Sequence, residues 1–262
     1  MNNKILEIQK VLMQDFLGQA FAYGNAKIPR TTLIINITSA EHCPSKARGL
    51  CHVTFCCYAG KCERIYPFYK RKNLFMEKWL YQTPTHKIIQ LIEAYIKYAP
   101  EPINCIRINE AGDFINQNQI VQWNKIAEYL FKTYGISTYT YTARTDLDFT
   151  MAPYIIVNGS LPGVKGAMRE FSCMPRIVFD NWQPGHHEYK CPGDCKICHL
   201  CSSRVQSIYH RAHGNPLSAA QGQHYQCCSR CATVGDQCAV RKDRETSGHF
   251  CQNGLFQYYF RE

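Results

Sequence analysis

The sequence predicts an α/β fold with a parallel sheet, followed by a cysteine-rich, metal-binding C-terminal region. Strand and helix patterns alternate through the middle of the chain, which is typical of parallel strands joined by right-handed crossovers. Regular periodicity ends near residue 185, after which Cys, Gly and His are frequent. Hydrophobic residues make up 45% of the chain, enough for a buried core. We therefore expect an α/β domain over residues 1–184 and a metal-binding region over 185–262.

The first part of the chain predicts one helix, one strand and an irregular loop. Apolar residues recur at helical spacing over residues 1–22. Residues 31–39, TTLIINITS, are rich in β-branched side chains and predict the first strand. Residues 40–75 carry five cysteines and are expected to be an irregular loop. The next helix is expected to begin at Thr83-Pro84-Thr85 and to end at Pro100 and Pro102.

The second strand, residues 103–109, has two different faces. Ile106 and Ile108 point to one side, whereas Cys105, Arg107 and Asn109 point to the other. In a parallel barrel the apolar side faces the helices and the polar side faces the lumen, which indicates a site. The alternative is a strand at the edge of the sheet.

Three further strands and one more helix complete the predicted α/β domain. The helix begins after a capping Asn118 and ends at Gly135, a residue type that favours helix C-termini. The strands are expected at residues 137–143, 154–157 and 176–179.

Cysteine usage and charge limit the possible environments and partners. The 16 cysteines are bunched, and the N-terminus lacks the continuous apolar segment of an export signal. We expect a cytoplasmic protein, without membrane spans, whose cysteines bind metal instead of forming disulfides. The formal charge of +10 indicates nucleic acid only weakly, because metal-bound thiolates add negative charge.

The first cysteine group follows the first strand, where parallel α/β folds bind ligands. Iron–sulfur clusters take almost only thiolates. Zinc is an alternative that could also use His42 and His52, and buried cysteines without metal are another. The group has five members: Cys43, Cys51, Cys56, Cys57 and Cys62.

The second cysteine group places four thiols within eleven residues, comparable to the tight runs that hold cubane clusters. A zinc ribbon is the rival, with Cys195 and Cys198 paired with Cys228 and Cys231. The members of the second group are Cys191, Cys195, Cys198 and Cys201. The later cysteines could complete the ribbon or hold another metal; they are Cys227, Cys228, Cys231, Cys238 and Cys251.

The segment Asn109-Glu110-Ala111-Gly112-Asp113 lies between the second strand and its helix. Acidic groups that flank a glycine at the end of a strand can receive the amino or hydroxyl groups of a ligand. A solvated turn is the more frequent explanation of such a segment.

Several short motifs resemble the gene product 88 family of phages and plasmids, which is similar to radical S-adenosylmethionine enzymes. They spread over residues 24 to about 201. The motifs are Gly24-Asn25 with Lys27-Ile28, Cys43-Pro44, Cys51, Cys57-Tyr58-Ala59, Arg107, Gly112-Asp113-Phe114 and the late CPGDCKICHLC.

The resemblance implies a partial (β/α) barrel over residues 1–184. It implies a 4Fe-4S cluster on Cys43, Cys51 and Cys57, with a fourth iron open to S-adenosylmethionine. The late cysteines would hold an auxiliary metal site. Residues expected at the cofactor are Tyr58, Glu110, Gly112 and Asp113. Polar residues expected to face an unknown substrate are Arg107, Asn109, Tyr139 and Tyr141.

Three functions follow as expectations. The first is a radical S-adenosylmethionine-type enzyme encoded by a mobile element. The second is a non-catalytic factor, stapled by zinc or iron–sulfur clusters, that binds nucleic acid or a protein. The third is an iron–sulfur redox carrier or sensor.

Overall fold

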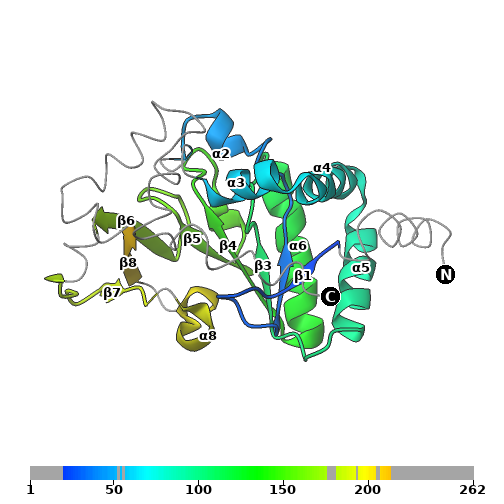
Figure 1. The fold of residues 1–262 in the computed structure, drawn as a ribbon. Helices are drawn as coiled ribbons and strands as arrows, with labels where there is room; N and C mark the ends of the chain where they lie inside the picture. Colours follow the sequence, from blue (N-terminus) through cyan, green and yellow to red (C-terminus); the bar gives the residue numbers. More distant parts are fainter. Residues whose placement is uncertain are drawn as a thin grey trace.

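The computed structural model describes residues 20–51, 54, 57–175, 181–192, 194–204 and 207–213. These residues form a mixed α/β fold in which helices pack against one face of a twisted sheet (Figure 1). None of the helices in this part of the chain combines the length and apolar character that crossing a membrane requires.

The sheet has eight strands in the order β1-β2-β3-β4-β5-β6-β8-β7. Only β1 runs antiparallel to its neighbour, and every other adjacent pair is parallel. Within the described residues no strand pairing joins β1 to β7. The strands are β1 (Ala22–Tyr23), β2 (Thr32–Ile35), β3 (Cys105–Ile108), β4 (Ser137–Thr142), β5 (Ile155–Gly159), β6 (Arg169–Pro175), β7 (Glu188–Lys190) and β8 (Ser207–His213).

The helices lie in the connections between these strands. The long helices are α4 (Pro67–Gln82), α5 (Thr85–Lys97) and α6 (Gln117–Tyr134). The shorter helices are α2 (Pro44–Ala47), α3 (Tyr58–Ile65), α8 (Cys195–Cys198) and the 3₁₀ turns η2 (Phe149–Met151) and η3 (Leu200–Ser202).

The predicted parallel sheet is confirmed over its central strands. The four strands expected at residues 31–39, 103–109, 137–143 and 154–157 appear as β2 to β5 and pair in sequence order. Because β3 pairs with both β2 and β4, the alternative of an edge strand is wrong.

The ends of α6 follow elementary helix-capping rules. Gly135 closes the helix in the left-handed conformation at φ 69°, as predicted. The N-terminal cap is Asn116 and not Asn118, because the Asn116 side chain accepts a hydrogen bond from the Gln119 N–H at 3.0 Å.

The cysteine-bearing loop is more regular than the sequence predicts. Residues 40–75 contain α2, α3 and the first half of α4. Pro44 and Pro67 start two of these helices, at positions where the missing N–H costs nothing. Helix α4 buries Asn73, Met76 and Leu80 at spacings of three and four residues.

Two other predicted elements differ or fall outside the described residues. The predicted helix 1–22 is described only from residue 20, where the chain bends into β1. The predicted strand 176–179 lies outside the described residues, and β6 ends just before it.

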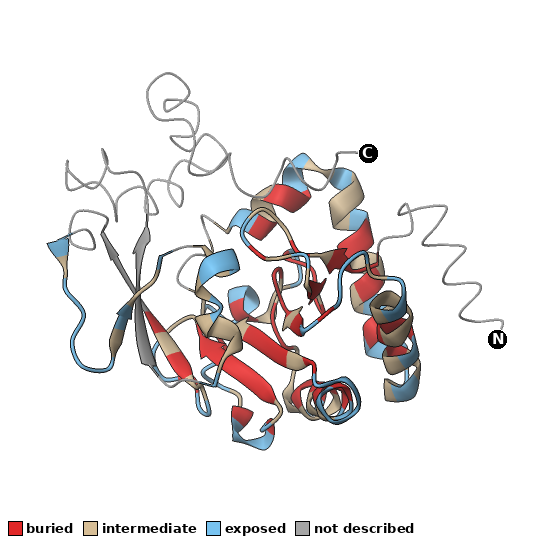
Figure 2. Cartoon of the chain, turned by 90° about the horizontal axis from the view of Figure 1, so that it is seen from below, coloured by how far each residue is buried: buried red, intermediate tan, exposed pale blue. Residues whose placement is uncertain are grey.

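The core lies between the helices and the face of the sheet that they cover. Ile106 and Ile108 of β3 are fully buried there, together with Trp123 of α6. Figure 2 shows the same concentration of buried residues on the central strands and on the helix faces turned toward them.

The other face of the sheet, here called the open face, carries a different set of side chains. Cys105, Tyr139 and Ile156 form a buried cluster on it, and Tyr141 and Cys201 pack against that cluster. The prediction that the two faces of β3 differ is therefore confirmed. Cys201, a member of the second predicted cysteine group, thus meets the sheet on its open face.

Candidate functional site

The first cysteine group lies beyond the carboxyl end of β2. Cys43 and Cys57 are the residues that precede α2 and α3, and the Cys57 Sγ accepts a hydrogen bond from the Gly60 N–H at 3.4 Å. The Cys51 N–H donates to the Ser45 carbonyl at 3.2 Å. Cys43, Cys51 and Cys57 are partly buried and form no disulfide. Cys56 lies outside the described residues.

Burial raises the pKa of two cysteines in this group. Burial raises the pKa of Cys43 to about 11, with further contributions from Asp113 and Cys51. Burial also raises the pKa of Cys62 to about 12, helped by Glu110 and Cys57. A bound cation is what would convert such thiols to thiolates.

The described side chains are not arranged as a complete metal site. Among them, no three His, Cys, Asp or Glu residues lie close enough together to hold a metal ion. His42, the alternative zinc ligand, has its Nδ1 3.0 Å from Glu77 Oε1. Binding a cluster would require the first-group sulfurs to approach one another.

Asp113 joins the ends of three neighbouring strand connections. Its carboxylate accepts hydrogen bonds from the Ser45 and Thr142 hydroxyls, both at 2.7 Å, and from the Ala143 N–H at 2.9 Å. Asp113 is 3% exposed, and burial raises its pKa while these hydrogen bonds oppose the rise. The contacts give Asp113 a role in positioning the Cys43 loop, and they leave its predicted contact with a ligand without support.

Gly112 allows the segment after β3 to touch the loop after β2. Its φ is 76°, and a Cβ would overlap the Thr38 hydroxyl and carbonyl oxygens. The Thr38 hydroxyl accepts from the Asp113 N–H at 2.7 Å and lies 2.9 Å from the Asp113 carbonyl. A close approach of two backbone segments therefore explains this glycine.

Glu110 lies between the first cysteine group and Asn25, in the segment that follows β1. Its carboxylate accepts a hydrogen bond from Asn25 Nδ2, and its N–H donates to Asn36 Oδ1 at 2.9 Å. The Tyr58 hydroxyl donates to the Glu110 carbonyl. Glu110 is 6% exposed. Tyr58 and Glu110, both predicted to contact a cofactor, are thus brought together beside Cys57.

Lys72 places a buried cation beside this group. It is 7% exposed, with its Nζ 5.2 Å from the centre of the Tyr69 ring. Burial lowers the pKa of Lys72 to about 8, although the nearby Glu110 acts in the opposite direction. The burial of Lys72 could not be predicted from the sequence pattern, because a lysine on a helix is usually solvated.

We expect Lys72→Met to stabilise the protein at pH 7. The folded state holds the Lys72 proton less tightly than the unfolded state, so ionised Lys72 costs about 3 kcal/mol below pH 8. The wild type regains this free energy as the pH rises from about 8 toward 10.5. Urea unfolding of both proteins at pH 7 and at high pH measures the difference.

The matched control for this prediction is Lys78→Met, at an exposed position of the same helix. We expect less than about 0.5 kcal/mol of change there. A Lys72→Met protein that is less stable than the wild type at pH 7 would contradict the prediction.

The four residues predicted to face a substrate lie on or beside the open face. The Arg107 guanidinium lies 5.1 Å from the centre of the Tyr141 ring, and the Tyr139 and Tyr141 rings are 6.2 Å apart. Burial raises the pKa of Tyr139, whereas Arg107 lowers it. The structure therefore brings Arg107, Tyr139 and Tyr141 together.

Asn109 has an unusual backbone conformation at the end of β3. Its φ is 61°, a region that side-chain-bearing residues rarely adopt, and it is 4% exposed. Its Nδ2 and the Arg107 Nε are shielded from water and have no hydrogen-bond partner among the described residues. Unsatisfied buried donors and backbone strain are both frequent at functional sites.

The second cysteine group lies against the opposite end of the open face. Cys191 follows β7, Cys195 and Cys198 bound α8, and Cys201 lies in η3. In Figure 1, α8 lies at one end of the strands and α2 and α3 at the other.

The members of the second group influence one another electrostatically. Burial raises the pKa of Cys201 to about 11, with contributions from Cys195 and Cys191 and opposing effects from Tyr141 and Arg169. The Cys198 Sγ lies 4.0 Å from the Tyr189 hydroxyl. Cys228, Cys231 and Cys238 lie outside the described residues, so the zinc-ribbon pairing stays a prediction.

Two buried polar residues that sequence patterns did not single out hold the second group in place. Asn158, fully buried in β5, donates through Nδ2 to the carbonyls of Thr140 and Cys201, both at 3.0 Å. Arg169, 1% exposed at the start of β6, donates to Asn158 Oδ1 at 2.9 Å. Asn158 could have been identified from the sequence, because it is a polar residue inside the apolar run IIVNG.

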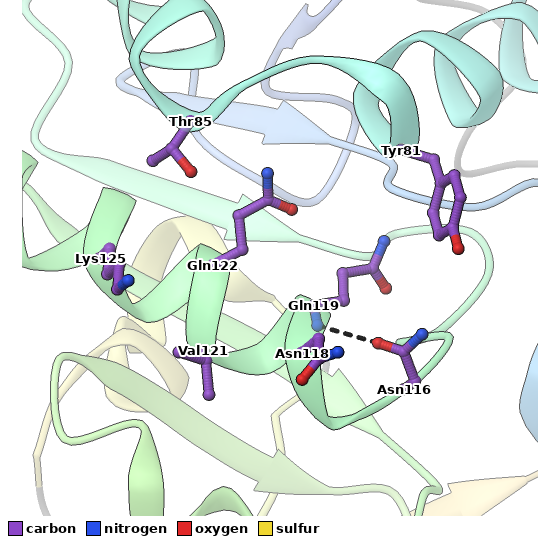
Figure 3. A pocket seen from close by; sticks show the side chains of 8 residues that line it. All are labelled: Tyr81, Thr85, Asn116, Asn118, Gln119, Val121, Gln122 and Lys125. Atoms are coloured by element: carbon purple, nitrogen blue, oxygen red, sulfur yellow. Dashed lines mark hydrogen bonds between the residues drawn. The ribbon is translucent and has the colours of Figure 1, made fainter.

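A pocket of about 410 Å³ lies elsewhere, between the end of α4 and the starts of α5 and α6 (Figure 3). Its wall is mainly amide and hydroxyl side chains such as Gln122 and Thr85. None of the predicted site residues lines it.

Comparison with known protein families identifies a relationship over most of the chain. The model of a family described as Gene product 88 matches residues 16–237, which include both cysteine groups. No curated protein and no solved structure matches the chain.

Proposed function

The chain belongs to the gene product 88 family, and from this premise we propose that it is a phage- or plasmid-encoded iron–sulfur protein of the radical S-adenosylmethionine type. The observation that carries the proposal is the position of three cysteines in the loop after β2. Cys43, Cys51 and Cys57 lie beyond the carboxyl end of β2, where parallel sheets bind ligands. A reducing compartment such as the cytoplasm suits this role.

The donor chemistry of the first group fits a 4Fe-4S cluster. Three thiols with no nitrogen or oxygen donor among them are the ligands that such clusters take. When bound on three sulfurs, the cluster supplies an open iron that is both Lewis-acidic and redox-active. Cys62 is more buried than Cys43, Cys51 and Cys57 and stays outside the proposed ligand set.

Glu110 and Tyr58 are the residues that we assign to S-adenosylmethionine. The Glu110 carboxylate lies beside Cys57-Tyr58 and accepts a hydrogen bond from the Asn25 amide, so it can also accept one from a ligand's amino group. The Tyr58 hydroxyl fixes the Glu110 backbone. Gly112 and Asp113 act on this site indirectly, by fixing the path of the chain between the two loops.

The open face is the proposed substrate side of a partial (β/α) barrel. Arg107, Tyr139 and Tyr141 line it, and Asn109 lies at the end of β3 with an Nδ2 that has no hydrogen-bond partner among the described residues. These side chains would orient a substrate and exclude water from it. The second cysteine group would form the auxiliary metal site at the other end of the face.

The test is the response of reduced, anaerobically reconstituted protein to S-adenosylmethionine. We expect the cofactor to change the electron paramagnetic resonance spectrum of the first cluster and to be cleaved. Cys43→Ala should abolish both effects, whereas Cys105→Ala, which removes a buried thiol outside either group, should keep them. A spectrum that does not change on addition of S-adenosylmethionine would contradict the open iron.

The composition of the chain favours a second candidate function. The formal charge of +10 and the many cysteines suit a non-catalytic, metal-stapled factor that binds nucleic acid or a protein. That function predicts bound zinc and nucleic-acid binding that weakens steeply as salt rises.

A further inference from the structure

Two arginines of this chain are equally buried and have different partners. Arg144 and Arg169 are each 1% exposed. The Nε and Nη2 of Arg144 donate to the Asp146 carboxylate at 2.7 and 2.9 Å, so its charge is matched. Arg169 has no carboxylate within ion-pair distance in the described part of the chain.

Every hydrogen-bond partner of Arg169 is neutral. Its Nη1 donates to Asn158 Oδ1 at 2.9 Å and to the Cys201 carbonyl at 3.4 Å. Its Nη2 donates to the Ser203 carbonyl and, at 3.1 Å, to the Ser203 hydroxyl. Its Nε is buried without a partner. A buried guanidinium with only neutral partners is unfavourable, because burial of a charge normally requires an anion.

The second cysteine group can supply negative charge beside Arg169. Arg169 Nη1 donates to the Cys201 carbonyl at 3.4 Å, and Cys201 ends the run of four cysteines that begins at Cys191 after β7. As thiols these cysteines are neutral. As ligands they are thiolates, and a divalent metal with four thiolates has an excess of negative charge.

We propose that Arg169 is the buried countercharge and positioning residue of an anionic four-thiolate metal centre at Cys191, Cys195, Cys198 and Cys201. This inference rests on the second metal site of the proposed function. It adds the residue that positions the ligands of that site and balances their charge. Arg169 fixes the backbone of the last ligand through the Cys201 and Ser203 carbonyls. Asn158 ties the same Cys201 carbonyl to β4.

The test uses Co²⁺ as the probe, because its absorption bands report thiolate coordination. The full chain carries Cys43→Ala, Cys51→Ala and Cys57→Ala to silence the first group, and is titrated anaerobically after metal removal. We expect thiolate-to-cobalt absorption bands, and we expect Cys191→Ala to remove or weaken them. A zinc ribbon formed without Cys191 would keep its bands in that variant.

Arg169→Met in the same background should weaken Co²⁺ binding by about 10- to 100-fold, as loss of a ligand-supporting residue typically does. Arg169→Lys, which keeps the charge without the planar fork, should lose less affinity. Arg144→Met is the matched control: it removes an equally buried arginine and should leave the Co²⁺ affinity unchanged.

Two results would overturn the inference alone: an unchanged Co²⁺ affinity in Arg169→Met, or an equal loss in Arg144→Met. Absence of thiolate bands in the parent background would overturn the second metal site itself, and the inference with it. If Arg169→Met folds poorly, the thermal melting of Arg169→Gln, measured with and without Co²⁺, tests the role of Arg169 instead. The substitution should lower the melting temperature of the Co²⁺-bound chain more than that of the metal-free chain, and the reverse order would refute the role.

Discussion

Alanine at any one of Cys43, Cys51 and Cys57 is expected to abolish the iron–sulfur absorption of the first site. A cluster held by three protein sulfurs has no spare protein ligand, so two remaining thiolates should fail to retain it. The measurement is iron-dependent absorption of the anaerobically reconstituted chain. Cys191→Ala and Cys201→Ala are included in every sample so that the second group does not contribute.

Cys62→Ala is the control that makes this experiment specific. Cys62 is near Cys57 and is buried, and its thiol lies beside Glu110. Its removal should leave the absorption of the first cluster in place, as should Cys56→Ala. If Cys62→Ala or Cys56→Ala loses the cluster while Cys57→Ala keeps it, the ligand assignment is wrong.

Asp113→Ala is expected to destabilise the metal-free chain by about 3–5 kcal/mol, among the largest effects of any single substitution. The substitution leaves two buried hydroxyls and two backbone N–H groups without their acceptor, at Ser45, Thr142, Ala143 and Phe114. Urea unfolding measures the change in the free energy of unfolding.

Ser45→Ala separates the network from its single contacts. It removes one donor and leaves the Asp113 carboxylate with its other partners, so we expect a loss of about 1 kcal/mol. If Asp113→Ala costs no more than Ser45→Ala, the carboxylate does not join the strand connections as described, and its predicted ligand contact regains support.

Sequence patterns predicted the elements whose signals are local. The alternation of Ile106 and Ile108 with Cys105 and Arg107 follows from strand geometry alone, and it identified the two faces of β3. Gly135 identified the end of α6, because few residues other than glycine favour the left-handed conformation found there. The alternation of strand and helix patterns is also read locally along the chain, and it predicted the parallel sheet.

Features that depend on distant contacts could not be predicted. Asp113 looks like a ligand-binding acid in sequence, and only the fold brings Ser45 and Thr142 to it. Arg169 looks like an ordinary surface arginine until the segment around Cys201 covers it. Helix α4 was missed because the cysteines before it suggested an irregular loop, although Met76 and Leu80 carry the helical spacing.

The most direct test of the central claim is the iron, acid-labile sulfide and zinc content of the full chain prepared without oxygen. We predict iron and sulfide in equal amounts, about four of each per 4Fe-4S cluster, with Cys43, Cys51 and Cys57 required for the share bound at the first site. Zinc without sulfide, or cysteines joined as disulfides with neither metal bound, would contradict it.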